Sequence, residues 1–275
     1  MLDLDRVKDF KVLLVGDGII DEYVYVKPLG KSIKDVAISA QYMREESFRG
    51  GVWAAAEHAS NFCGSVDVLA GPKVMRNMRF VEEAYVRKMF TLHEMEDNDV
   101  VKEADIRSYD CVIVADFGHG TMTKDMIQRV SKEARFLAVN AQTNTTNYGF
   151  NLITKYPRAD LVVVDELEAR LAAHDRESDI EDVILALGFK NIIVTMGYNG
   201  AVGFDGAFHR VKGTTKDAVD TMGAGDAFLA VAAPFAAARF SMRDVVRIGN
   251  AAGAAKIGIV GHRQSVTKEM VQAHL

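Results

Sequence analysis

Six short apolar runs recur along the chain, bounded by Gly, Asp or Asn residues. Their apolar character is continuous and not alternating, which is typical of strands that are buried on both faces of a sheet. Segments of helical length lie between them, so the pattern predicts an α/β fold: a doubly wound, mostly parallel sheet with helices on both faces. The expected strands are residues 11–17, 66–71, 111–117, 136–141, 161–166 and 192–197.

The helical segments carry some of their own end signals. One of them opens on Ser178 with Glu181 three residues later, which is the pattern of a capping box, and it closes at Gly188. Residues 201–211 hold an Asp-Gly pair at their centre and predict a β-hairpin. The expected helices are residues 52–62, 123–134, 166–174 and 178–188.

Two segments, residues 23–48 and 85–96, depart from this alternation of strand and helix. Apolar and polar side chains alternate within both, as they do in half-exposed antiparallel strands. The chain has no Pro/Gly/Ser-rich linker and no internal repeat. We therefore expect a single domain over residues 1–275, with a small antiparallel β-lid inserted at these two places.

Composition argues against several classes of protein. Apolar residues make up 49% of the chain and charged residues 26%, and no apolar stretch approaches the roughly 20 residues that a membrane span needs. The formal net charge is -5 with Lys and Arg scattered, so we expect no nucleic-acid partner. The N-terminus is acidic and its apolar run is too short for a secretory signal, which favours a cytoplasmic protein.

The stretch DTMGAGDAF, Asp220 to Phe228, sets two glycines and two aspartates before an apolar run. That run is apolar on every side, which indicates a buried helix that begins near Ala224 or Gly225. Free amides at a helix N-terminus favour an anion, and glycines let a phosphate approach the backbone closely. We expect a phosphate cradle here; the alternative is that Asp226 is only the N-cap of the helix.

The same stretch resembles the C-terminal signature of the ribokinase-like (PfkB) sugar kinases, Asp-Thr-x-Gly-Ala-Gly-Asp, and matches all six specified positions. The N-terminal VLLVGDGIIDEYVY, the glycine pair at 50–51 and VADFGHG at 114–120 are similar to the family in order and spacing. Within the family the chain looks closest to the heptose-phosphate kinase branch. The resemblance implies an ATP- and Mg²⁺-dependent kinase that phosphorylates a hydroxyl of a sugar or sugar phosphate.

The resemblance also implies roles for individual residues. Asp226 matches the general base, and the anion hole matches Gly223, Ala224 and Gly225. The positions that contact the sugar match Asp21, Gly50, Gly51 and Asp116. The nucleotide-binding positions match Thr195, Gly197, Gly200 and Asn250. The magnesium positions match Glu168 and Asp165.

Two departures from the family pattern fall on ligand-facing positions. The family's magnesium motif is Asn-x-x-Glu, whereas Asp165 stands here in place of the Asn; an aspartate still supplies an oxygen to a hard cation. An asparagine usual after the glycine pair is absent, and Trp53 is found there, either as a core aromatic or as a platform for the sugar. These changes leave open a non-catalytic relative that binds nucleotide or sugar and has a regulatory role. Retention of Asp226 and both cradle glycines favours the kinase.

Other site types do not fit the sequence. The GDGIID segment has Asp21 where a dinucleotide fold needs its third glycine, no P-loop motif occurs, and no histidines are paired at zinc-binding spacing. A phosphorylated acceptor is favoured, with basic lid residues as candidates for meeting its phosphate. These candidates are Lys31, Lys34, Arg44 and Arg49. We also expect a homodimer formed through the lid, and the sequence leaves open whether the chain is one part of a longer fusion protein.

Overall fold

The structure, a computed structural model, describes residues 2–95, 104–213 and 218–275. Within this part of the chain the main sheet has eight strands in the order β12-β11-β10-β9-β8-β7-β1-β4. All neighbours are parallel except β10–β11 and β11–β12, which form antiparallel pairs at one edge. The bounds are β1 Lys11–Gly16, β4 Ser65–Ala70, β7 Cys111–Asp116, β8 Leu137–Ala141, β9 Leu161–Asp165, β10 Ile192–Thr195, β11 Ala201–Phe204 and β12 Phe208–Val211. The predicted doubly wound sheet is confirmed, and so is the hairpin.

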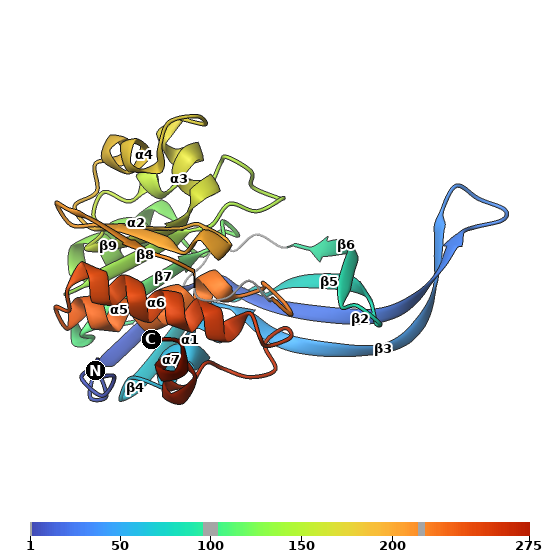
Figure 1. The fold of residues 1–275 in the computed structure, drawn as a ribbon, viewed down its shortest axis with the longest axis horizontal. Coiled ribbons are helices and arrows are strands. Elements are labelled where there is room, and N and C mark those ends of the chain that lie inside the picture. The colour runs from blue at the N-terminus through green and yellow to red at the C-terminus, as the bar shows by residue number, and fades with distance from the viewer. Residues whose placement is uncertain (1, 96–103, 214–217) are drawn as a thin grey trace.

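Helices cover both faces of the main sheet (Figure 1). One face carries α1 Val52–Ser60, α5 Ala224–Ala237, α6 Met242–Lys256 and α7 Lys268–His274; the other carries α2 Lys124–Glu133, α3 Glu166–Ala173 and α4 Ile180–Leu187. Single 3-10 turns lie at η1 Ile106–Ser108, η2 Ile153–Lys155 and η3 Gly197–Asn199. None of the described helices is long and apolar enough to cross a membrane.

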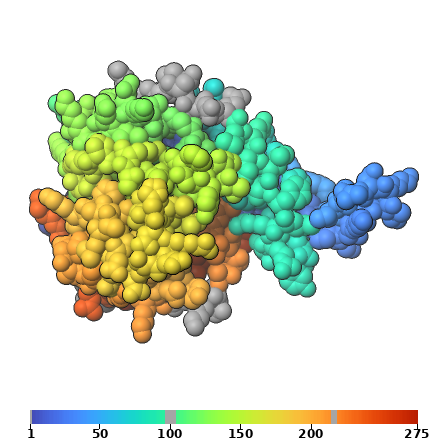
Figure 2. All heavy atoms as spheres, turned by 90° about the horizontal axis from the view of Figure 1, so that it is seen from above, coloured from blue at the N-terminus to red at the C-terminus, as the bar shows by residue number. Residues whose placement is uncertain are grey.

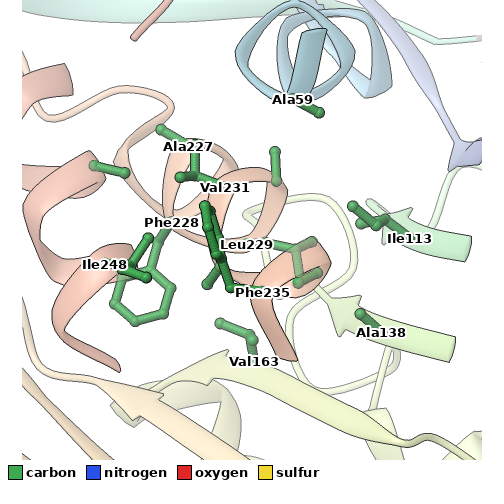
Figure 3. Close-up of a cluster of buried hydrophobic side chains, with 14 of the residues drawn as sticks. Ala59, Ile113, Ala138, Val163, Ala227, Phe228, Leu229, Val231, Phe235 and Ile248 are labelled. Atoms are coloured by element: carbon green, nitrogen blue, oxygen red, sulfur yellow. The ribbon is translucent and has the colours of Figure 1, made fainter. Parts of the chain in front are cut away.

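Helix α5 runs through the centre of one of the two large hydrophobic cores that flank the main sheet. Figure 3 shows its side chains packed between the main sheet and the neighbouring helices, and the sheet residues in this view are Ile113, Ala138 and Val163. Burying a large apolar side chain contributes about 1.5–3 kcal/mol, so a helix enclosed on all sides must be apolar around its whole circumference. This packing fixes the N-terminus of α5 at the C-terminal edge of the sheet.

A second sheet, here called the lid sheet, has the strand order β3-β2-β5-β6. Its strands are β2 Gly18–Lys31, β3 Ile38–Gly51, β5 Met75–Glu82 and β6 Arg87–Glu94. The β2–β3 hairpin projects far from the body of the molecule (Figures 1 and 2). The prediction of a separate small lid is confirmed, although strand β5 lies outside both predicted segments and pairs in parallel with β2. Residue 96, the end of the second segment, lies outside the described residues.

The predicted capping box at Ser178 and Glu181 is wrong. Helix α4 begins after Asp179, and no side chain caps it. The Ser178 backbone amide, which the Glu181 side chain would accept in a capping box, donates to Asp175 instead. Glu181 forms an ion pair with Arg210 on β12. The helix does end at Gly188, in the left-handed conformation that glycine favours at this position.

Candidate active site

A cavity of about 770 Å³ lies between the lid sheet and the C-terminal ends of the parallel strands of the main sheet. This edge is where ligands bind in open α/β sheets. Residues from β9, β10, α5 and α6 line its main-sheet side, and residues from β2, β5 and β6 line its lid side. The cavity therefore brings together segments from both ends of the chain.

The N-terminus of α5 opens into this cavity. Gly223 is the N-cap, with φ 73°, and a Cβ there would lie 2.7 Å from His262 Cε1, so both its conformation and its surroundings require glycine. A Cβ on Gly225 would meet nothing within 4 Å, which leaves the backbone open to a ligand. The first amides of a helix have no partner within the helix and attract anions. Gly223, Ala224 and Gly225 thus form the floor of the expected phosphate cradle.

Asp226 lies in the first turn of α5, three positions after the N-cap, and lines the cavity. Because Gly223 occupies the N-cap position and no side chain caps this helix, the reading of Asp226 as the N-cap is wrong. Burial, followed by the repulsion of the Asp21 carboxylate, raises the pKa of Asp226 to about 7. A carboxyl group with this pKa can take up a proton near neutral pH, as a general base must.

Asp21 faces the cavity from strand β2 of the lid sheet. Its Oδ1 accepts hydrogen bonds from Arg79, at 2.8 Å and 3.1 Å, and from Asn77 at 3.4 Å, which fix the orientation of the carboxylate. His262 Nε2 lies 3.8 Å from Oδ2, and burial lowers the pKa of this histidine to about 4, so its ring is neutral at pH 7. A Cβ on Gly50 would lie 2.3 Å from Oδ2. Gly50 is therefore outside the cavity lining but makes room for Asp21.

Asp220 joins the cradle to the lid. Its carboxylate accepts hydrogen bonds from the Tyr23 hydroxyl at 2.7 Å and from Lys88 Nζ at 2.9 Å, both on lid strands. It also accepts the backbone amides of Met222 at 3.1 Å and Gly261 at 2.9 Å. Burial opposes ionisation, but these donors outweigh it and hold the pKa of Asp220 at about 2. The anionic form of Asp220 is thus a structural anchor.

The residues expected to bind nucleotide all line the cavity. Thr195 ends strand β10, and Gly197 and Gly200 flank the following turn; all three line the cavity together with Asn250 of α6. Gly200 has φ 91°, and a Cβ there would lie 2.0 Å from Val211 O, so only glycine fits. The Asn250 amide donates to the Lys212 carbonyl, 2.9 Å away, which ties α6 to the end of β12.

Asp165 and Glu168 both line the cavity at the end of β9, and they form a capping box at the start of α3. Asp165 accepts the Glu168 amide, and Glu168 accepts the amides of Asp165 and Thr143. Burial, followed by the neighbouring Asp165 carboxylate, raises the pKa of Glu168, and burial raises that of Asp165. Across the described ranges, no group of three or more His, Cys, Asp or Glu side chains is placed to hold a metal ion.

Asp165 and Glu168 nevertheless fit a cation that is also held by phosphate oxygens and water. A nearby cation would favour the ionised form of both carboxyl groups, whose pKa values are otherwise raised. Mg²⁺ is usually bound in this way, by one or two carboxylates together with substrate phosphates. The donor set at this turn therefore fits Mg²⁺ held jointly with a nucleotide.

Several sequence candidates lie away from the cavity. Asp116 is buried and bonds to the Tyr156 hydroxyl at 2.5 Å and to Lys155 at 2.6 Å, so it organises its own loop. Trp53 packs against Gly18 and the core, as the core reading expected. The four basic residues expected to meet a second phosphate do not line the cavity, and that expectation needs correction: they are Lys31, Lys34, Arg44 and Arg49.

Sequence reasoning missed four residues of the site: Tyr23, Arg79, Lys256 and His262. Arg79 lies on strand β5, a segment for which the sequence pattern predicts neither a strand nor a helix. The one sequence signal for Lys256 is its position directly after the stretch AAGAA on α6, whose small apolar residues indicate a buried helix. Tyr23 and His262 carry no local signal, because only the tertiary fold brings them to Asp220 and Asp21.

Solved structures share this architecture. An Arabidopsis thaliana ribokinase complexed with ribose and ATP superposes with a TM-score of 0.73 at 16% identity, covering 96% of this chain and 98% of that one. The Escherichia coli phosphofructokinase-2 in complex with potassium gives a TM-score of 0.70 at 15% identity, covering 98% of both chains. At these identities the likeness defines the fold: a ribokinase-like α/β protein with a lid sheet.

The sequence comparison narrows the class further. Residues 76–269, which make up more than half of the chain, match the pfkB family carbohydrate kinases. The chain belongs to the pfkB family of carbohydrate kinases. Relatives named bifunctional protein HldE are 23% identical over 99% of this chain in Hyphomonas neptunium and 21% identical over 94% in a Nitratiruptor species. The chain spans 65% and 64% of the length of these two relatives.

Proposed function

We propose that this protein is an ATP-dependent kinase that transfers the γ-phosphate of ATP to a hydroxyl of a sugar or sugar phosphate. The observation that carries the proposal is Asp226, a carboxyl group with a pKa near 7 in the first turn of α5, next to Gly225, whose backbone is open to the cavity. Phosphoryl transfer requires mainly positioning and charge stabilisation, and a base next to an anion cradle supplies both.

In the proposed reaction, the acceptor hydroxyl lies between the two facing aspartates of the cavity. Asp21 orients the sugar, and ionised Asp226 accepts the hydroxyl proton as the oxygen attacks the γ-phosphorus. The amides of Gly223 to Gly225 stabilise the charge on the transferred phosphoryl group. Thr195 and Asn250 line the part of the cavity where we place the nucleotide.

Asp165 and Glu168 would hold Mg²⁺ beside the nucleotide phosphates. The ion, when bound, neutralises phosphate charge and favours in-line transfer. The protein's own part is to keep both carboxyl groups at the cavity wall, and the capping box of α3 does this.

We further propose a phosphorylated sugar as the acceptor and a homodimer as the assembly. Arg79 and His93 line the lid side of the cavity, where an anionic acceptor would lie. The curated relatives named HldE agree with the resemblance to heptose-phosphate kinases. The outer face of the lid sheet bears Phe90 and Leu92, which are 55% and 53% exposed, and Phe90 stacks on Phe80. An apolar face of this kind commonly packs against a second copy.

The test of the proposed reaction is Asp226→Asn. Asparagine keeps the size of the side chain and removes the base, so we expect kcat to fall by about 10²- to 10⁴-fold while ATP affinity changes little. Turnover is measured as ADP release against a panel of sugars and sugar phosphates, and ATP affinity by calorimetry on the same preparation.

The fold supplies an internal control for this variant. The pKa of Asp226 is raised on folding, so its ionisation costs stability as pH rises from about 4 to 7. The asparagine variant escapes this cost and should melt at or above the wild-type temperature at pH 8. A variant that is folded and turns over within a few-fold of wild type would refute the catalytic role. Nucleotide binding by a wild-type protein that phosphorylates no sugar would instead favour the regulatory relative.

A further inference from the structure

Lys256, the last residue of α6, is completely buried. It is the one lysine among the buried residues of the described ranges. Lysine is almost never fully buried without a partner, because removing an ammonium group from water is costly. Its position at the C-terminal end of a helix is favourable for a cation but does not offset that cost. The surroundings of this side chain must therefore compensate for the buried charge.

The ammonium group bonds to the backbone of two separate loops. Its Nζ donates to the carbonyl of Met222 at 2.8 Å and to that of Gly261 at 2.7 Å. Met222 directly precedes the cradle, and Gly261 directly precedes His262, which faces Asp21. The Lys256 stem also packs beneath the cradle, since a Cβ on Gly223 would lie 3.3 Å from its Cε.

Asp220 holds the same two residues by their other polar groups. It accepts the amides of Met222 and Gly261, whose carbonyls bond to Lys256. Both backbone groups of both residues are thus fixed by a buried anion and a buried cation. Removing either charge would release the cradle loop and the turn after α6 together.

The charges around Lys256 come from several elements. Burial has the largest effect and lowers the pKa of Lys256; the carboxylates of Asp220, Asp226 and Asp21 oppose this effect and favour the charged form, whereas Lys88 of β6 adds to it. Lys256 in turn lowers the pKa of Asp226, while Asp21 raises it. The ammonium therefore acts on the proposed base as a fixed positive charge from below the cradle.

We infer that Lys256 is a positioning residue for phosphoryl transfer, an internal cation that holds the cradle loop and the turn after α6 in place. Its charge also favours the ionised form of Asp226. The inference rests on the proposed function. It concerns a side chain that does not line the cavity: its bonds run to main-chain carbonyls, and its effect on the reaction passes through Gly223 and Asp226.

The test compares Lys256→Met with Lys268→Met. Lys268 of α7 pairs with Asp5 at 2.6 Å and does not line the cavity, so its substitution is a control that removes one partly buried ammonium group elsewhere. We expect Lys256→Met to lower kcat by about 10- to 100-fold, because misplaced reacting groups cost rates of this order. The KM for ATP should change far less, and the control should resemble wild type.

The pH profile separates positioning from simple loss of packing. With the ammonium removed, the acid limb of kcat/KM should move upward by about one unit, the lower end of the effect of a nearby opposite charge. Lys256→Arg, which keeps the charge, should leave the midpoint near that of wild type. An unchanged midpoint in Lys256→Met would overturn the inference. Lys256→Gln, which keeps an N–H donor without the charge, replaces the methionine variant if the latter does not fold.

A readout without turnover keeps this inference distinct from the proposed function. The ¹³C signal of the Asp226 carboxyl carbon, assigned by its absence in Asp226→Asn, reports titration of the group directly. A higher midpoint in Lys256→Met supports the inference even if no sugar is phosphorylated, in which case only the proposed reaction fails. A midpoint equal to that of wild type refutes the role of Lys256 whatever the activity.

Discussion

At the scale of single residues, the site depends on how burial redistributes protons. Asp226 and Asp220 are six positions apart in one motif, yet burial raises the pKa of Asp226 to about 7, whereas donors outweigh burial and hold that of Asp220 at about 2. The difference lies in their partners: Asp220 accepts four hydrogen bonds, whereas Asp226 faces the Asp21 carboxylate. One aspartate is thus fixed as an anion, and the other can exchange a proton.

This difference predicts the pH dependence of the wild-type enzyme. A base must be ionised to act, so kcat/KM should rise about tenfold per pH unit below pH 7 and level off above it. The measurement is a coupled assay from pH 5 to 9 with saturating Mg²⁺, with the coupling enzymes in excess at each pH. A profile that stays flat between pH 5 and pH 8 would contradict Asp226 as the titrating base.

At the scale of elements, the turn between β9 and α3 serves two purposes. The Asp-x-x-Glu sequence at Asp165 and Glu168 is the capping box of α3 and also faces the cavity. The spacing of Ser178 and Glu181 fits a capping box equally well, which is why the sequence pattern predicts one there instead. The backbone decides between them: the Ser178 amide is taken by Asp175, and α4 starts one residue later than the pattern requires.

The two roles of this turn can be separated by a pair of substitutions. Asp165→Asn keeps the cap, since Asn caps as well as Asp, but removes a negative charge. It should therefore raise the Mg²⁺ concentration for half-maximal activity several-fold with Tm unchanged. Glu168→Gln sets an NH₂ group against backbone amide donors at a cost of about 1–3 kcal/mol, so its Tm should fall by about 2–10 °C. An identical Mg²⁺ dependence in Asp165→Asn and wild type would remove Asp165 from the metal site.

At the scale of the whole molecule, the lid sheet has two different faces. Its inner face carries Asp21 and Arg79 towards the cavity, and Tyr23 bonds from the same side to Asp220. Its outer face carries Phe90 and Leu92, which the described part of the chain leaves exposed. The long β2–β3 hairpin extends this sheet well beyond the body of the molecule (Figure 2). The lid is thus tied to the site on one side and open to a partner on the other.

The proposed homodimer predicts that a negative charge on the outer face of the lid sheet disrupts the assembly, whereas the same charge on a different surface does not. Leu92→Asp should convert the dimer to a monomer, because a buried unpaired carboxylate is costly. Leu185→Asp on α4 is the matched control, since both leucines are 53% exposed, and it should leave the mass unchanged. Sedimentation velocity at micromolar concentration measures both variants. A wild-type protein that sediments as a monomer would disprove the assembly.

The sequence by itself predicted the alternation of strands and helices in the main sheet, the buried strands and a helix start that is open to an anion. These features are local: continuous apolar runs indicate strands buried on both faces, and the glycines around Ala224 indicate a helix start open to an anion. The GAGD motif therefore pointed to the start of α5 and to Asp226 as candidates, and the resemblance that it carried indicated the family that the comparison shows. Strand β5 escaped prediction because its cavity-facing side carries the polar residues Asn77 and Arg79, so apolar and polar side chains do not alternate along it.

Only the tertiary structure decided which charged residues belong to the site. Asp116 and the basic residues of the hairpin lie away from the cavity, whereas Arg79, His262 and Lys256 surround the aspartates. The physical reason is that hydrogen bonds and Coulomb interactions depend on the distance between groups in space, and this distance does not depend on how far apart the residues lie in the sequence. Lys256 bonds to residues 34 positions before it and 5 after it, and no local pattern indicates such a contact.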